Sequence, residues 1–166
     1  MILVVMGVSG SGKSTIGEML AKQLQCEFLD ADDFHPPANK DKMRAGIALD
    51  DHDRWPWLDR LKTELTARQA QGQHCVLACS ALKQRYRDRL GIDQQEIFSV
   101  QLEGTAETLQ QRLSSRQHEF MSPALLRSQL QALEPARDGL IVDIADTPEN
   151  IVGRISKWLA CAGSQS

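Results

Sequence analysis

The sequence predicts an α/β fold, in which helices cover both faces of a mainly parallel sheet. Short apolar runs with no polar interruption alternate with longer segments of helical periodicity, and this alternation is typical of such folds. A glycine-rich stretch, GVSGSGKS, directly follows the first apolar run, where a parallel sheet would place a phosphate site. With 166 residues the chain is long enough for one domain, residues 1–166, and too short for two comfortable ones.

The elements follow from the hydrophobic pattern. Residues 2–6 are expected to form a buried strand, and a helix is expected over residues 14–25. Further strands are predicted at residues 26–29, 73–79, 97–102 and 140–144, each separated from the next by a helical pattern. The final helix is predicted over about residues 148–162, with a proline near its start. The five strands predict the fold of the phosphate-loop (P-loop) NTPases.

Composition excludes several classes of function. A net charge of −3 gives no global basic field, so no nucleic-acid partner is expected. The four cysteines lack the spacing of a zinc site or of a disulfide framework, and the two at Cys75 and Cys79 are expected to be buried on one strand face. The apolar start is too short for a signal peptide, and no run approaches the length of a membrane span. We expect a protein of the reducing cytoplasm, without a membrane partner.

The stretch GVSGSGKS satisfies the P-loop pattern GxxxxGK[ST]. Its glycines let main-chain N–H groups converge on phosphate oxygens, and the following helix presents the positive end of its dipole. In this pattern Lys13 reaches the β- and γ-phosphates and the Ser14 hydroxyl ligates Mg²⁺. We therefore predict binding of a nucleoside triphosphate with Mg²⁺ at Gly7, Val8, Ser9, Gly10, Ser11, Gly12, Lys13, Ser14 and Thr15.

A GTP-dependent switch is disfavoured. The guanine-binding pattern NKxD fails at its last position, because residues 39–42 read NKDK and lie too early in the chain. The letters DxxG at residues 88–91 fall at the end of a helical pattern, where Gly91 is better interpreted as a helix cap.

Two acidic residues follow the second predicted strand. Asp30 and Asp32 are two apart at a strand end, so both can project toward the phosphate loop where the chain begins to turn. Transfer of a phosphoryl group to an alcohol needs one group that holds the metal and another that orients the hydroxyl and accepts its proton. We predict the metal role for Asp30 and the proton-accepting role for Asp32, whereas Asp33 could equally be a turn residue.

Four stretches together resemble the gluconate kinase family over nearly the whole chain: GVSGSGKS, DADDFHPPANKDKMRAGIAL with DDHDRWPWL, CSALKQRYRD, and SQLQALE. The resemblance implies ATP-dependent phosphorylation of D-gluconate at its 6-hydroxyl. It also implies an acceptor-binding segment at about residues 30–60, a lid at about residues 112–135 and, as is frequent in the family, a homodimer.

The acceptor would be an acidic polyol. A carboxylate suits a fork-shaped cation, and hydroxyls suit Asp, His, Ser or Asn. Candidates in the matching segments are His35, Arg54, Ser80, Lys83 and Arg87, with the division of labour between Arg54 and Lys83 left open. The tryptophans on either side of Pro56 are expected to pack and so to fix Arg54, rather than to stack on a sugar.

Two arginines are predicted to act from the lid. Arg112 and Arg116 are four residues apart; Arg116 would neutralise charge on the transferring phosphate, and Arg112 would contact the nucleotide. The chain departs from the family pattern here, because Glu119 stands where the family has histidine, and we assign no role to the neighbouring His118. Alternatives to gluconate are another small sugar acid or a shikimate-like acid. A third hypothesis, a nucleotide-dependent regulatory or nucleic-acid-binding module, fits the mild acidity poorly.

Overall fold

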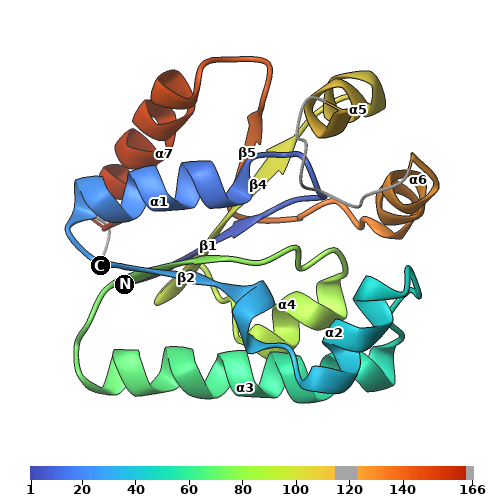
Figure 1. Cartoon of the computed structure of the whole chain (residues 1–166). Coiled ribbons are helices and arrows are strands. Elements are labelled where there is room, and N and C mark those ends of the chain that lie inside the picture. The colour runs from blue at the N-terminus through green and yellow to red at the C-terminus, as the bar shows by residue number, and fades with distance from the viewer. Residues whose placement is uncertain (115–122, 164–166) are drawn as a thin grey trace.

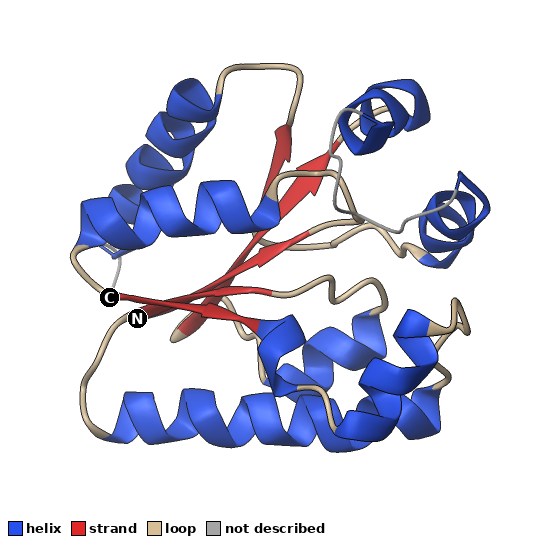
Figure 2. Ribbon diagram, viewed as in Figure 1, coloured by secondary structure: helices blue, strands red, loops and turns tan. Residues whose placement is uncertain are grey.

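The computed structural model describes residues 1–114 and 123–163. Its centre is a five-stranded parallel sheet in the order β2-β3-β1-β4-β5 (Figures 1 and 2). The strands are β1 (Ile2–Met6), β2 (Glu27–Asp30), β3 (Cys75–Ala78), β4 (Ile97–Glu103) and β5 (Leu140–Asp143). In the register of the sheet, Val4 of β1 lies beside Leu77 on one side and Ser99 on the other. The predicted parallel α/β architecture is confirmed.

Helices cover both faces of the sheet (Figure 1). On one face, α1 (Lys13–Leu24), α5 (Ala106–Ser114), α6 (Pro123–Ala132) and α7 (Pro148–Gly163) contribute to one apolar cluster. On the other face, α3 (Asp51–Ala70) and α4 (Gln84–Leu90) form a second cluster. Along β1 the residues alternate, so Leu3 belongs to the first cluster and Val4 to the second. Both faces of the central strand are therefore buried, which explains its uninterrupted apolar sequence.

The predicted strands differ from the observed ones only at their ends. The second strand begins at Glu27, because the N–H of Cys26 donates to the Ala21 carbonyl at the end of α1. Cys75 and Cys79 are buried in the same cluster, as expected from their spacing. Gly91 caps α4 in the left-handed conformation at φ 83°, which confirms that interpretation of the residues 88–91.

The predicted acceptor-binding segment is largely helical. After β2 come a short 3₁₀ helix, η1 (Ala31–Phe34), then α2 (Pro37–Arg44) and the start of α3. A capping box begins α3: Asp50 accepts from the N–H of Asp53, and the Asp53 carboxylate accepts from the N–H of Asp50. None of the described helices is long and apolar enough to cross a membrane.

Candidate active site

A cavity of about 720 Å³ opens at the carboxyl ends of the strands. Its walls come from the loop after β1, the η1–α2 segment, the start of α3, the end of β3 and one face of α6. Because β3 lies between β1 and β2, the turn at Ser80 separates the phosphate loop from the acidic residues after β2. The main-chain N–H of Gly7 donates to the Ser80 carbonyl at 3.4 Å, which joins the loop after β1 to the end of β3.

Eleven of the predicted residues line this one cavity. They are Ser9, Gly10, Gly12, Lys13, Ser14, Thr15, Asp30, Asp32, His35, Ser80 and Arg54. Residues from the predicted nucleotide loop and from the predicted acceptor segment therefore meet in one space, as transfer between two bound molecules requires.

The phosphate loop has the backbone geometry of an anion cradle. Gly10 and Gly12 lie at φ 83° and 92°, which non-glycine residues rarely adopt. Gly12 is also the N-cap of α1 and carries no side chain that could cap the helix, so the first N–H groups of α1 point into the loop. Lys13 folds back and its Nζ donates to the Val8 carbonyl at 3.1 Å. These features fit a triphosphate, whose oxygens would accept from the amides and from Lys13.

Gln129 of α6 reaches into this loop. Its side-chain oxygen accepts a hydrogen bond from the main-chain N–H of Ser9 at 2.8 Å, across 120 residues of sequence. An amide carbonyl thus satisfies one donor of the loop in the structure. The sequence analysis quoted Gln129 within SQLQALE and gave it no role, because nothing in its spacing predicts that α6 packs against the loop.

Asp30 and Asp32 both face the cavity. The Asp30 carboxylate accepts from the N–H of Asp32 at 3.0 Å and so caps η1. Partial burial raises the pKa of Asp30, chiefly because a charged carboxylate loses solvation there. The Asp32 side chain is 75% exposed, so an incoming hydroxyl can reach it.

The donor set also fits Mg²⁺. The Ser14 hydroxyl and the Asp30 carboxylate line the same cavity, and oxygen ligands of this kind are those that Mg²⁺ prefers. Among the described residues there is no group of three or more His, Cys, Asp or Glu side chains that could hold a metal by itself. In phosphoryl-transfer sites Mg²⁺ is usually held by one or two protein oxygens together with phosphate oxygens of the nucleotide.

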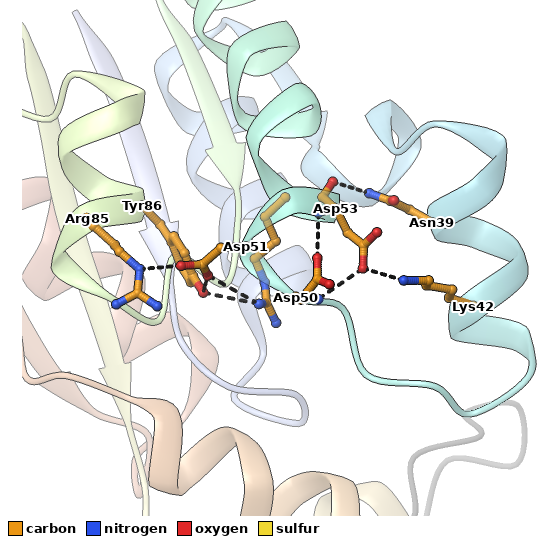
Figure 3. Close-up of polar contacts among 8 residues, drawn as sticks. Asn39, Lys42, Asp50, Asp51, Asp53, Arg85 and Tyr86 are labelled. Carbon is orange, nitrogen blue, oxygen red and sulfur yellow. Dashed lines mark hydrogen bonds and ion pairs between the residues drawn. The ribbon is translucent and has the colours of Figure 1, made fainter.

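Arg54 lies in the cavity wall at the first turn of α3. Its Nη1 donates to the Tyr86 hydroxyl at 3.1 Å, and its guanidinium lies 5.2 Å from the centre of the Tyr86 ring. Tyr86 in turn donates to the Asp51 carboxylate at 2.6 Å, and Asp51 also pairs with Arg85 of α4 (Figure 3). The aromatic ring and the α3–α4 contact thereby hold Arg54 at the cavity. The sequence analysis gave Tyr86 no role, because tyrosine is common in protein cores and nothing in its spacing indicates a contact with Arg54.

The structure does not bring Lys83 and Arg87 to the cavity. Lys83 is the N-cap of α4 and is not among the described residues that line the space. Arg87 is 3% exposed, and its guanidinium donates to three carbonyls, those of Ala81, Leu82 and Glu134. Its Nη1 is buried too. The predicted substrate contact of Arg87 is therefore corrected to a structural role, because its buried guanidinium bonds main-chain carbonyls and does not line the cavity.

The predicted lid arginines have different outcomes. Arg112 lies beside the phosphate loop, since a side chain added at Gly12 would come within 3.8 Å of its Nη1, and its Nη2 donates to the Ile144 carbonyl at 2.8 Å. It is not among the described residues that line the cavity. Arg116, with His118 and Glu119, lies outside the described residues.

Two further arginines of α4, Arg85 and Arg89, connect this helix to α3. Arg85 pairs with Asp51 at 2.8 Å, and Arg89 makes two hydrogen bonds to Asp59 at 2.6 and 3.0 Å. About half of each arginine side chain remains exposed. These residues belong to the surface and form ion pairs between the two helices.

Known proteins resemble this chain in sequence and in fold. A gluconokinase from Arabidopsis thaliana is 44% identical over 174 aligned positions, which cover 96% of this chain and 92% of that protein. The chain belongs to the gluconokinase family. A crystal structure of a gluconokinase from Sinorhizobium meliloti superposes with a TM-score of 0.85 at 38% identity, covering 99% of this chain and 96% of that one. A sugar kinase from Janibacter gives a TM-score of 0.89 at 42% identity, with 96% and 94% covered.

Similarity to kinases of other acceptors is weaker. The family model described as shikimate kinase matches residues 9–157. A shikimate kinase from Aquifex aeolicus, however, is 17% identical with a TM-score of 0.60, and an APS kinase from Mycobacterium tuberculosis is 19% identical with a TM-score of 0.66. The P-loop kinase fold is thus confirmed by all of these neighbours, and membership of the gluconokinase family by the more similar ones.

Proposed function

We propose that this chain phosphorylates D-gluconate at its 6-hydroxyl with ATP, giving 6-phospho-D-gluconate and ADP. The observation that carries the proposal is the single cavity in which Lys13 and Ser14 of the phosphate loop face Asp32 and Arg54 of the acceptor segment. Gluconokinase relatives at 39–46% identity support the choice of gluconate as acceptor.

Each group has a role that follows from its chemistry. Lys13 and the loop amides hold the β- and γ-phosphates and neutralise charge that spreads over the transferring group. Asp32 binds the 6-hydroxyl and accepts its proton as the oxygen attacks the γ-phosphorus, and ADP leaves on the opposite side. Mg²⁺, when bound at Ser14 and through water at Asp30, supplies additional positive charge to the phosphates. Closure of the cavity by the segment at about residues 112–135, with Arg116, would exclude water.

Arg54 is assigned to the carboxylate end of gluconate. A guanidinium can donate two parallel hydrogen bonds to a carboxylate, and Arg54 is held at the cavity wall by Tyr86 while about a quarter of its side chain remains exposed. Lys83 would need to move to reach the same substrate, since it lies outside the cavity lining. Of the two cations whose roles the sequence left open, Arg54 is therefore the better candidate.

The test is an acceptor panel assayed with ATP and Mg²⁺. Gluconate, related aldonates, shikimate and nucleoside monophosphates are compared by coupled detection of ADP, and the product is identified by mass and by ³¹P NMR. We expect gluconate to give the highest kcat/KM. Preference for shikimate, the acceptor named in the matching family model, would refute the assignment. ADP release without any acceptor dependence would refute kinase activity. The same preparation, analysed by light scattering, tests the expected homodimer.

A further inference from the structure

A buried polar cluster lies beside Asp32. His35 and Asn39 are 5% and 3% exposed, and the His35 ring stacks on the Trp57 indole with centroids 4.1 Å apart. His35 lines the cavity, whereas Asn39 lies behind it on α2. The sequence analysis considered His35 as a substrate contact and gave Asn39 no role.

The hydrogen bonds of Asn39 determine which nitrogen of His35 carries the proton. The Asn39 side-chain nitrogen donates to the main-chain carbonyl of Asp53 at 2.8 Å (Figure 3). A carbonyl can only accept, so this end of the amide must be the NH₂ group. The same NH₂ lies 3.1 Å from His35 Nδ1. Because the NH₂ group can only donate, Nδ1 accepts and carries no proton, and the proton of the neutral ring is on Nε2.

The surroundings keep the ring neutral. Burial, followed by the positive charges of Lys40 and Arg54, lowers the pKa of His35 to about 4. The side chain of Asp32 is 75% exposed, so solvent screens the effect of its charge on the ring. The Asp53 carboxylate pairs with Lys42 at 2.8 Å (Figure 3). At neutral pH, His35 is therefore a donor through Nε2–H alone.

That donor faces the acceptor of the proposed reaction. Nε2 of His35 lies 3.9 Å from Oδ1 of Asp32, which is too far for a direct hydrogen bond. One hydroxyl oxygen at about 2.8 Å from both atoms would fit between them. It would accept from Nε2–H and donate its own proton to the carboxylate. An ether oxygen could accept from Nε2–H but could not donate to the carboxylate, and a methylene group could do neither.

We propose that Asn39 is a positioning residue that fixes His35 as the Nε2–H tautomer, and that His35 and Asp32 together bind the reacting hydroxyl of the acceptor. His35 directs a lone pair of the hydroxyl toward itself, and Asp32 receives the hydroxyl proton. The identity of the bound hydroxyl rests on the proposed function. The assignment of the His35 tautomer rests on hydrogen-bond geometry alone.

The tautomer is tested without any assay of activity. Long-range ¹H–¹⁵N NMR spectra of ¹⁵N-labelled protein at neutral pH distinguish the two neutral tautomers and the cation, and the His35 signals are those lost in His35→Gln. We expect the Nε2–H tautomer in the wild type. In Asn39→Asp, whose carboxylate accepts from Nδ1, we expect a proton on Nδ1. A wild-type ring that is charged, or protonated on Nδ1, would overturn the proposal.

Kinetics test the role in the reaction, with the acceptor that the panel identifies. His35→Leu and Asn39→Asp should lower kcat roughly 10- to 100-fold, because the hydroxyl is no longer oriented, while the Kd for ATP changes less than about twofold. His35→Gln places an amide donor near the position of Nε2 and should retain about tenfold more activity than His35→Leu. Asp41→Asn, on the exposed side of α2, is the matched control and should leave kcat unchanged.

The outcomes separate this proposal from the function. Equal activity of His35→Gln and His35→Leu would refute the role of the Nε2–H donor, even if gluconate is the substrate. The expected tautomer and the expected order of variants with an acceptor other than gluconate would support the proposal and refute the choice of gluconate.

Discussion

Replacing Arg87 by methionine should unfold the protein at lower temperature and leave acceptor binding intact. The guanidinium donates to the carbonyls of Ala81, Leu82 and Glu134 at 2.8, 3.1 and 2.5 Å. The Leu82 carbonyl keeps a second donor, the N–H of Glu134 at 2.7 Å, so the larger loss falls on the carbonyls of Ala81 and Glu134. The Ala81 carbonyl is buried, and leaving it unpaired costs about 1–3 kcal/mol. The Glu134 carbonyl belongs to an exposed residue and loses a hydrogen bond to a charged group, which is worth about 1.5–3 kcal/mol.

The cost of burying Arg87 offsets part of this loss. Desolvation lowers the pKa of Arg87, which shows that its charge is unfavourably placed, and methionine removes that charge while retaining an apolar stem. We expect a net loss of about 3 kcal/mol in the free energy of unfolding, or roughly 6–12 °C in Tm for a domain of this size.

Thermal unfolding and steady-state kinetics, measured on the same samples, separate stability from binding. Arg54→Met is the comparison, because Arg54 lies in the cavity wall and makes one hydrogen bond to a side chain. It should raise the KM for the acid acceptor at least tenfold, since a guanidinium–carboxylate contact is lost, with a small change in Tm. An unchanged Tm together with a raised acceptor KM in Arg87→Met would refute the structural role and restore Arg87 to the substrate.

Three further predictions concern the cavity. Asp32→Asn should lower kcat roughly 10²- to 10⁴-fold with little change in the Kd for ATP, and near-normal turnover would remove Asp32 from the mechanism. Gln129→Leu should bind ATP about 2- to 10-fold more tightly by calorimetry, because the Ser9 amide no longer has a competing acceptor. Weaker binding of ATP would contradict this prediction, and Gln131→Leu on the exposed side of α6 is the control. Because the pKa of His35 is lowered to about 4, the unfolded chain binds more protons than the folded one between about pH 4 and 6.5. The free energy of unfolding should therefore be highest above pH 6.5 and fall toward pH 4, by at most about 3 kcal/mol relative to His35→Gln. The same pH dependence in the wild type and in His35→Gln would place the pKa of His35 near its ordinary value.

Features encoded by adjacent residues could be predicted from the sequence. The strand at Ile2–Met6, the phosphate loop after it and the helix beginning at Lys13 all follow from local spacing and from glycine conformations that other residues rarely adopt. Asp30 and Asp32 were also correctly expected at the loop's side of the sheet, because the carboxyl ends of parallel strands meet at one edge.

Features that depend on packing between distant segments could not be predicted. Lys83 and Arg87 share a helical spacing that would suit two ligands, yet Arg87 turns inward toward carbonyls that the spacing does not reveal. The contact between Gln129 and the Ser9 amide depends on how α6 packs against the loop. Likewise, Asn39 gains its role from a carbonyl of the helix that follows, fourteen residues away.

The need for a buried arginine at position 87 follows from the loop that precedes α4. Ala81 has φ 42°, in a region unusual for alanine, so this turn cannot pair its carbonyls as a helix or strand would. One guanidinium carries five donors on three nitrogens in a fixed plane and can bond several separated carbonyls at once, whereas the three donors of lysine all lie on one nitrogen. Glu134 completes the junction: its N–H donates to the Leu82 carbonyl, and its carboxylate accepts from the first N–H of α4 at Gln84. These bonds join the segment after α6 to the turn that bears Ser80. They thereby fix the position of α6, whose Gln129 contacts the phosphate loop, relative to Ser80 at the cavity.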